Sequence, residues 1–305
     1  DRVTALTRGA DGRIAVQTKS GAAATYDFIV GAVGVNASSL PLFENLGIAF
    51  SPPRTAKTFI CEVSLGRDRV KECLGNAMHV FLLDLPGLEF AAAIPKGDYV
   101  TLCMLGDNLD EKAVTRFMTS PEVRACLPFD WETEKPACRC GPKLNMGGAK
   151  NYYADRVLLI GDCGVSRLYK DGIGAAYRTA KACAVSAIFG GIAATDFDRY
   201  FRKRCRAIEW DNFLGKMVFG GAVLFRKLPF LRRAMLRMVR REQAVKGGGR
   251  PMSLVLWNTF TGSAPYKEIV LRSLMPDFWG VFSLECLRSL LGLKPKAAVP
   301  ASAGE

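Results

Sequence analysis

The segment from Arg156 to Ala180, RVLLIGDCGVSRLYKDGIGAAYRTA, constrains the fold most strongly. An apolar strand runs into a Gly-Asp pair, and further glycines open an alanine-rich helix. Glycines at both turns let the backbone approach a phosphate-bearing cofactor, and α/β folds bind ligands at the carboxyl ends of their strands. The segment therefore predicts a strand-turn-helix unit of a doubly wound sheet. Asp162 would accept hydrogen bonds from sugar hydroxyls, and the helix start would favour negative charge.

The segments before this unit are rich in β patterns. From Val3 to Val35 the sequence predicts a hairpin that turns at Asp11-Gly12, followed by the strand YDFIVGAV. From Pro41 to about Gly148, short β-rich runs between turn residues predict an antiparallel meander, and DEKAVTRFMTSPEVRACL predicts a helix over one face. The chain opens directly in a strand, so we expect it to be a fragment.

We expect an α/β protein in which one domain is interrupted by another. Residues 1–40 and 151–198 would form a partial cofactor-binding domain, and residues 41–150 a β-rich substrate domain. Residues 199–293 have a helical pattern, and the small, polar residues 294–305 predict a disordered tail.

Cysteine and histidine usage excludes some classes of site. Ten cysteines without a CxxC pair and a single histidine, His79, argue against a zinc site and against a secreted disulfide framework. We therefore expect no metal, and we interpret Cys138, Cys140 and His79 as structural. The same cysteine usage predicts a reducing, cytoplasmic compartment, and no uncharged apolar run reaches the length of a spanning helix. We therefore expect a cytoplasmic protein that lies peripherally at the inner membrane face.

Two glycine segments together carry a resemblance to a known family. YDFIVGAVGVNAS is similar to a D-x-x-V-G-A-x-G-x-x-S segment, and DRVLLIGDCG with DGIGAAYRTAKACA is similar to a Gly-Asp segment and its following helix. AAIPKGDYVTL resembles a Phe-Pro-Lys-Gly-Asp strand turn between them. In this order the segments resemble FAD-dependent oxidoreductases of the geranylgeranyl reductase family and their relatives, the aromatic hydroxylases. The resemblance covers roughly residues 1 to 200.

The resemblance implies an FAD/NAD(P)-binding Rossmann-like domain with an inserted antiparallel sheet. It places Gly161 and Asp162 beside the ribityl and pyrophosphate part of FAD, and Ala32 and Gly34 on the dinucleotide side. The helix start would face the pyrimidine edge of the flavin through Gly172, Ile173, Gly174 and Ala175. The family's opening strand with G-x-G-x-x-G is absent from these residues, and RLYKDGIG replaces the usual proline before the helix glycines.

The resemblance also implies the reaction. The expected protein reduces or dehydrogenates carbon-carbon double bonds of an apolar, isoprenoid-like substrate at a membrane surface, with NAD(P)H as a possible electron donor. One alternative is a flavin-dependent monooxygenase, and a second is a non-catalytic, membrane-associated lipid-binding protein. Tyr177 and Cys163 are the nearest catalytic candidates, although a free cysteine next to Asp162 is more typical of a buried strand end.

The positive charge is concentrated in one stretch. Within residues 212–241 no acidic residue occurs, and seven arginines and lysines from Arg226 to Arg241 alternate with apolar residues. Such a pattern is typical of a helix lying on anionic lipid, and the alternative is a core helix with a solvated basic face. Aromatic residues are not interleaved as stacking platforms, so we expect no nucleic-acid partner. The later aromatic segment, from Leu254 to Phe282, would line an apolar pocket or join the membrane-facing surface.

Overall fold

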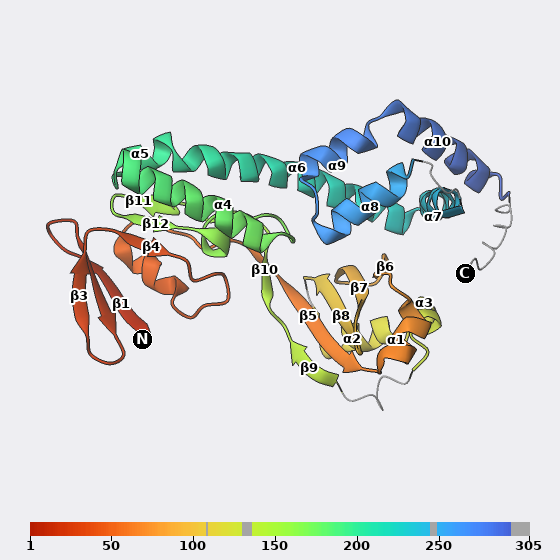
Figure 1. Cartoon of the computed structure of the whole chain (residues 1–305), viewed down its shortest axis with the longest axis horizontal. Helices are drawn as coiled ribbons and strands as arrows, with labels where there is room; N and C mark the ends of the chain where they lie inside the picture. The colour runs from red at the N-terminus through yellow and green to blue at the C-terminus, as the bar shows by residue number, and fades with distance from the viewer. Residues whose placement is uncertain (108, 130–135, 245–248, 294–305) are drawn as a thin grey trace. The chain divides into compact units, whose positions relative to one another are not determined.

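The computed structural model describes residues 1–107, 109–129, 136–244 and 249–293. Its internal contacts divide the chain into two compact units, an N-terminal unit, Asp1–Glu209, and a C-terminal unit, Trp210–Glu305 (Figure 1). The predicted tail, residues 294–305, lies outside the described residues.

A small mixed sheet in the N-terminal unit joins segments that are far apart in sequence. Its order is β11 (Tyr153–Ala154), β12 (Val157–Leu159) and β4 (Ile29–Gly31). Strands β12 and β4 run parallel, with Val157 opposite Ile29 and Leu159 opposite Gly31. The residues of β12 are fully buried, which explains the continuous apolar run in the sequence. A domain interrupted by an insertion requires such a pairing between strands from its first and its last segment. The predicted boundaries of that domain, residues 1–40 and 151–198, stay a prediction.

The predicted hairpin is present and gains a third strand. Strands β1 (Val3–Arg8), β2 (Ile14–Thr18) and β3 (Ala23–Tyr26) form an antiparallel sheet. The prediction of one continuous strand YDFIVGAV is wrong, because β3 ends at Tyr26 and β4 belongs to the other sheet. The break occurs where Asp27 pairs with Arg13 and Arg156, and where the N–H of Ile29 donates to the carbonyl of Arg156 at 3.0 Å.

The β-rich middle of the chain forms a six-stranded antiparallel sheet, as predicted. Its strands are β5 (Thr55–Ser64), β6 (His79–Phe81), β7 (Leu88–Lys96), β8 (Tyr99–Gly106), β9 (Pro136–Cys140) and β10 (Lys143–Asn145). The sheet is more than a simple meander: β6, β7 and β8 follow one another, and then β5 pairs with β8 and also receives β9 and β10. A strand that enters the sheet interior in this way cannot be placed from local patterns.

One face of this sheet is covered by helices α1 (Arg67–Leu74), α2 (Glu111–Met118) and α3 (Pro121–Cys126). Their residues Val70, Phe117 and Val123 pack with the strand residues Val63 and Leu102. The helix predicted across residues 110–127 is two helices, because Pro121 starts a new one after Ser120.

The opposite face of the sheet bears the alternating strand residues. Thr58 lies opposite Leu105, which lies opposite Phe90, and Ala92 lies opposite Cys103. Four of these five are buried, and Cys103 is half-buried. Because helices α1 to α3 lie on the other side, these side chains are buried by residues outside those helices.

Helical segments complete the N-terminal unit around a second core that contains Phe43, Leu158, Phe197 and Phe201. They are η1 (Leu40–Leu46), η2 (Gly161–Cys163), α4 (Gly172–Val185), the π-helical turn η3 (Ser186–Gly190), α5 (Ala194–Arg199) and the first part of α6 (Phe201–Lys227).

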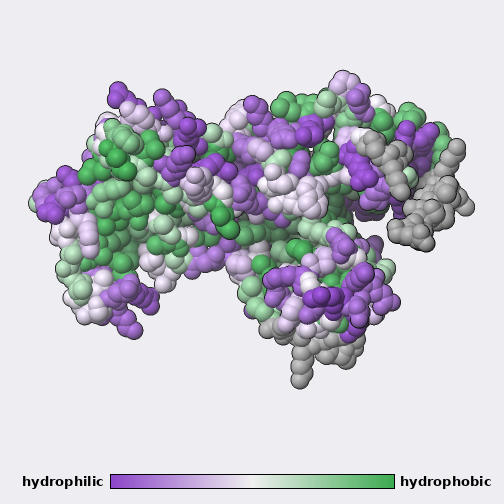
Figure 2. Space-filling view, in the orientation of Figure 1, coloured by the Kyte–Doolittle hydropathy of each residue, from purple (hydrophilic) through white to green (hydrophobic). Residues whose placement is uncertain are grey.

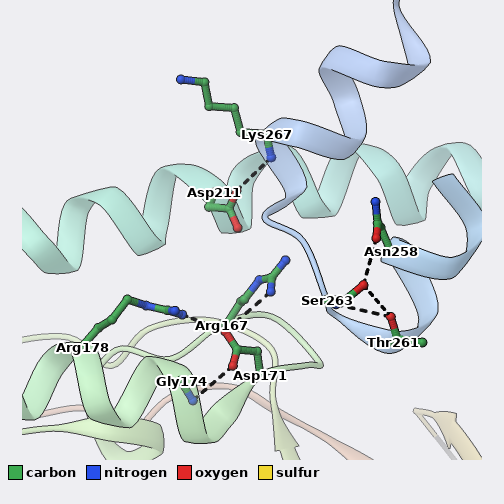
Figure 3. A network of polar contacts seen from close by, with 9 residues as sticks. All are labelled: Arg167, Asp171, Gly174, Arg178, Asp211, Asn258, Thr261, Ser263 and Lys267. Carbon is green, nitrogen blue, oxygen red and sulfur yellow. Dashed lines mark hydrogen bonds and ion pairs between the residues drawn. The ribbon is translucent and has the colours of Figure 1, made fainter. Parts of the chain in front are cut away.

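The C-terminal unit is helical, as predicted. After the end of α6 it contains α7 (Pro229–Ala244), α8 (Pro251–Thr261), α9 (Tyr266–Ser273) and α10 (Pro276–Leu290). Helix α10 packs on α7. It also contacts the end of α6, because the ring of Phe282 in α10 lies 5.7 Å from the ring of Phe225 in α6. The N–H of Lys267 at the start of α9 donates to Asp211 of α6 at 2.9 Å (Figure 3). Within the described residues, no helix combines the length and the apolar character needed to cross a bilayer.

Candidate functional site

The Gly-Asp turn after β12 is bound to helix α4. Gly161 has φ +64°, and a methyl group added there would lie 3.2 Å from the Cβ of Ala176. Its N–H donates to the hydroxyl of Thr179 at 2.9 Å, and that hydroxyl donates to the carbonyl of Ala175 at 3.0 Å. A glycine is therefore needed here both for its backbone conformation and for the close approach of the helix.

Asp162 lies at the carboxyl end of β12, against the first turn of α4. A methyl group added at Gly172 would lie 3.4 Å from Oδ1 and 3.6 Å from Oδ2 of Asp162. The carbonyl of Asp162 accepts a hydrogen bond from Nδ2 of the buried Asn145 at 3.0 Å, and Oδ1 of Asn145 accepts from the N–H of Gly147 at 2.8 Å. The structure thus brings together Asp162 and Gly172, which the sequence predicted as parts of one site. Asn145 was missed, because nothing around it in sequence marks it.

Helix α4 begins with a cap supplied by its own chain. Asp171 has φ +57°, and its side chain accepts from the N–H of Gly174 at 3.1 Å. Its Oδ2 also pairs with Arg178 at 2.9 Å and with the buried Arg167 at 3.6 Å (Figure 3). The N–H of Gly174 is therefore engaged within the chain, and negative charge is already present at the helix start. The aspartate before the helix glycines is an ordinary N-cap signal that the sequence prediction did not use.

The loop after β4 lies beside the Gly-Asp turn. The thiol of Cys163 donates to the carbonyl of Gly31 at 3.2 Å. Gly34 has φ +69°, and a methyl group added there would meet no heavy atom within 4 Å. Ala32 is exposed directly after the strand. The loop with Ala32 and Gly34, which was predicted for the dinucleotide side, therefore lies at the same end of the parallel strand pair as Gly161 and Asp162, which were predicted for the ribityl side.

The two catalytic candidates occupy different environments. Cys163 is fully buried, and burial raises the pKa of its thiol, an effect that backbone hydrogen bonds with Val33 and Gly34 oppose. This environment suits a tether between two loops better than a reactive thiolate. Tyr177 lies on the outer side of α4 with 66% of its surface exposed, as does Ile173 with 89%. The assignment of either residue to catalysis stays a prediction.

Lys170 connects the start of α4 to the face of the large sheet opposite helices α1 to α3. Its Nζ lies 5.1 Å from the centre of the Phe90 ring. Burial lowers the pKa of Lys170, and the nearby Cys103 acts in the opposite direction. The neighbouring Tyr169 has φ +60°, and burial together with Glu89 and Asp107 raises its pKa to about 12. Sequence reasoning missed Lys170, although it noted that RLYKDGIG departs from the family pattern at this point.

His79, Cys138 and Cys140 are the residues that the sequence analysis interpreted as structural. His79 makes a hydrogen bond with the carbonyl of Leu74 at 3.2 Å. Cys138 and Cys140 are exposed on the edge strand β9, and their thiols hydrogen-bond to one another. In the part of the chain that the structure describes, no three His, Cys, Asp or Glu side chains are grouped to hold a metal ion.

Comparison with known proteins identifies the fold. No family model and no curated protein matches the chain. A flavoprotein/dehydrogenase from Cytophaga hutchinsonii has a similar structure, with a TM-score of 0.55 and 13% identity, over 96% of this chain and 69% of that one. The Diels-Alderase PyrE3 matches with a TM-score of 0.50 and 18% identity, over 69% of this chain and 46% of that one. PqsL of Pseudomonas aeruginosa, described as a probable FAD-dependent monooxygenase, has a TM-score of 0.47 and 15% identity, over 73% of this chain and 66% of that one.

The fold is therefore a mixed α/β architecture similar to that of the Cytophaga hutchinsonii flavoprotein/dehydrogenase and of PyrE3. The chain spans about half to two thirds of the length of the solved structures that it matches. None of the three structures described above is named as a geranylgeranyl reductase.

Proposed function

We propose that the N-terminal unit supplies the flavin-side half of the cofactor site of an FAD-dependent oxidoreductase. The observation that carries the proposal is the position of the Asp162 carboxylate, at the carboxyl end of a strand in a parallel pair and against Gly172 at the start of α4. Ligands of doubly wound sheets bind at this place. Three segments separated in sequence converge there, namely the loop after β4, the Gly-Asp turn and the helix start.

The residues present fit the ribityl side of FAD. Asp162 is half-buried and offers carboxylate oxygens to ribityl hydroxyls, while the space beside Gly34 leaves room for a ligand next to the backbone. The start of α4 would hold the pyrimidine edge through Gly172 and Ile173. Bound FAD would supply hydride transfer or oxygen activation, and the protein would supply orientation and electrostatics.

The adenosine diphosphate side of FAD needs a further element. Among residues 1–107, 109–129, 136–244 and 249–293, no strand pairs with the outer edge of β4. Val30 of β4 is exposed, and Figure 2 shows hydrophobic side chains at the surface around β4, β12 and α4. We propose that a parallel strand with a glycine-rich turn adds at this edge and holds the phosphates.

Among flavin reactions, we favour monooxygenation over the reduction of an isoprenoid-like alkene. The carrying observation is Lys170, which places a partly buried ammonium group over Phe90 on the sheet face that adjoins the helix start. A substrate with an acidic or phenolic group would offer this ammonium group a counter-charge, whereas a wholly apolar chain would offer none. NAD(P)H is the proposed electron donor.

The test is purification of the protein from its complete reading frame, followed by an absorbance spectrum. We expect bound flavin in the wild type and a loss of at least about tenfold in flavin affinity in Asp162→Ala, because ribityl hydroxyls lose their acceptor. Asp68→Ala, which removes an exposed carboxylate from α1, is the matched control and should keep the flavin. A colourless wild type would overturn the proposal. NADPH-dependent oxygen uptake stimulated by phenolic or aromatic acids would support monooxygenation, and anaerobic turnover of an alkene would contradict it.

A further inference from the structure

Helix α10 carries large apolar residues on both of its sides. Its inner side buries Phe278 and Phe282 against the rest of the C-terminal unit. Its outer side exposes Trp279, Leu284, Leu287, Leu290 and the following Leu291, with 58% of Leu287 and 74% of Leu291 accessible. A surface helix of a soluble domain ordinarily presents charged residues on its outer side. Here the outer side between Trp279 and Leu291 is formed by apolar and small residues, with Arg288 at its margin.

The exposed apolar surface continues into the preceding turn. Leu271 at the end of α9, and Leu274 and Met275 between the helices, are each more than half exposed. We call these eight residues the α9–α10 apolar face: Leu271, Leu274, Met275, Trp279, Leu284, Leu287, Leu290 and Leu291. Figure 2 shows hydrophobic side chains at the surface along α9 and α10, with hydrophilic ones beside them. An apolar surface of this extent on one element marks an interaction site.

The same unit carries most of the net positive charge of the chain. Residues 210–305 contain 15 lysines and arginines and 6 aspartates and glutamates, so they hold +9 of the formal net charge of +13. Helix α7, which packs on α10, exposes Arg233, Arg240 and Arg241. A cationic surface next to an apolar one fits a binding partner that combines anionic groups with apolar chains.

Most acidic residues of this unit are already engaged. Glu242 accepts from the N–H groups of Met252 and Ser253 at 2.9 and 2.8 Å. Glu285 pairs with Arg288, and Glu268 pairs with Arg272, each at 2.8 Å. The exposed Asp277 lies in the first turn of α10, between Met275 and Trp279 in sequence. The arginines of α7 are therefore not neutralised by an equal number of carboxylates.

We propose that the α9–α10 apolar face enters the interfacial region of an anionic lipid bilayer, while the arginines of α7 contact the lipid headgroups. The sequence prediction placed the membrane surface on residues 212–241, and it left the segment from Leu254 to Phe282 either as the wall of an apolar pocket or as a part of that surface. Helix α7 buries Ala234, Met235 and Met238, and Leu236 is its exposed large apolar residue. Helix α7 therefore supplies mainly charge, and α10 supplies most of the exposed apolar area.

The experiment is flotation of the complete protein with vesicles of phosphatidylcholine alone or mixed with phosphatidylglycerol. We expect binding to the mixed vesicles that weakens as salt is raised, because charged headgroups are screened. The double variant Leu287→Glu, Leu291→Glu should bind at least about tenfold less, since it puts two charges on the apolar face. Tyr26→Glu, at an exposed position on β3 in the N-terminal unit, is the matched control and should bind as the wild type does.

A charge-reversal variant and tryptophan fluorescence test the two parts of the proposed surface separately. Arg233→Glu, Arg240→Glu changes only exposed side chains, so it should remain folded by circular dichroism and lose the preference for phosphatidylglycerol. Tryptophan fluorescence should shift to the blue on binding, and Trp279→Phe should remove most of that shift. Equal vesicle binding by the wild type and the Leu287, Leu291 variant would overturn the proposal. So would a wild type that ignores vesicles and instead forms dimers that this variant dissociates, because the face would then bind a second copy. Neither result depends on whether the protein binds flavin.

Discussion

The hydroxyl oxygen of Thr179 lies 2.9 Å from the backbone nitrogen of Gly161 and accepts its hydrogen bond inside the protein. Thr179 is fully buried, so its loss cannot be compensated by water. We expect Thr179→Val to lower the free energy of unfolding of the N-terminal unit by about 1–3 kcal/mol, because the N–H of Gly161 is left without an acceptor. Chemical denaturation measures this. Thr179→Ser keeps the hydroxyl and should be more stable than Thr179→Val. A valine variant as stable as the wild type would contradict the role of this hydrogen bond.

Asp171 combines a helix cap with an unusual backbone conformation. Asp171→Ala should lower the free energy of unfolding by about 1–2 kcal/mol, because the cap on Gly174 is lost and alanine is poorly suited to φ +57°. Asn is also a good cap and tolerates this conformation, so Asp171→Asn should lose only the ion pairs with Arg178 and Arg167. Thermal unfolding of the three proteins distinguishes the contributions. An alanine variant as stable as the asparagine variant would contradict the capping role.

Lys170 should make stability depend on pH in the alkaline range. Burial lowers its pKa in the folded state, so the unfolded chain binds the proton more readily and the wild type becomes relatively more stable as the pH rises through that lowered pKa. Lys170→Met removes the buried charge, and we expect it to raise the free energy of unfolding at neutral pH by about 1 kcal/mol. The difference between the two proteins should shrink toward about pH 10. Urea unfolding at several pH values measures it, and a difference independent of pH would contradict the assignment.

The cysteines should divide sharply by reactivity. Cys138 and Cys140 are exposed, whereas Cys61, Cys163, Cys183 and Cys205 are buried. Burial raises the pKa of Cys183 to about 11 and contributes most to raising that of Cys205 to about 12. We expect a thiol reagent to modify Cys138 and Cys140 first in the native protein, and the four buried cysteines only after unfolding. Peptide mass spectrometry reads the order. Modification of Cys163 as fast as Cys138 would show an accessible thiol beside the Gly-Asp turn.

Local patterns were sufficient where one short segment decides the structure. The run before Gly161 predicted a buried strand, and the glycines before the alanine-rich residues predicted the start of α4. The antiparallel character of the middle sheet also followed from its short β-rich runs. Local patterns failed at Asp27, because β3 before it pairs with β2 whereas β4 after it pairs with β12, which lies far later in the sequence.

The candidate site shows the same division. Sequence spacing indicated Asp162 and Gly172 as parts of one site, and the folded chain places them in contact range. It could not indicate Asn145 or Lys170, because their roles come from contacts with Asp162 and Phe90, which lie in other elements. A side chain reaching across elements leaves no periodic signal in its own segment.

The sequence by itself determined the glycine turns, the helical pattern of the C-terminal unit and its excess of positive charge, because these depend on residue type and near neighbours. Only the tertiary structure decided that β4 and β12 are parallel partners, and that the apolar surface of the C-terminal unit lies on α9 and α10 rather than on the basic helix α7. The physical reason is that both sides of α7 and of α10 carry apolar residues. Packing against the other helices decides which of those sides is buried and which is left exposed.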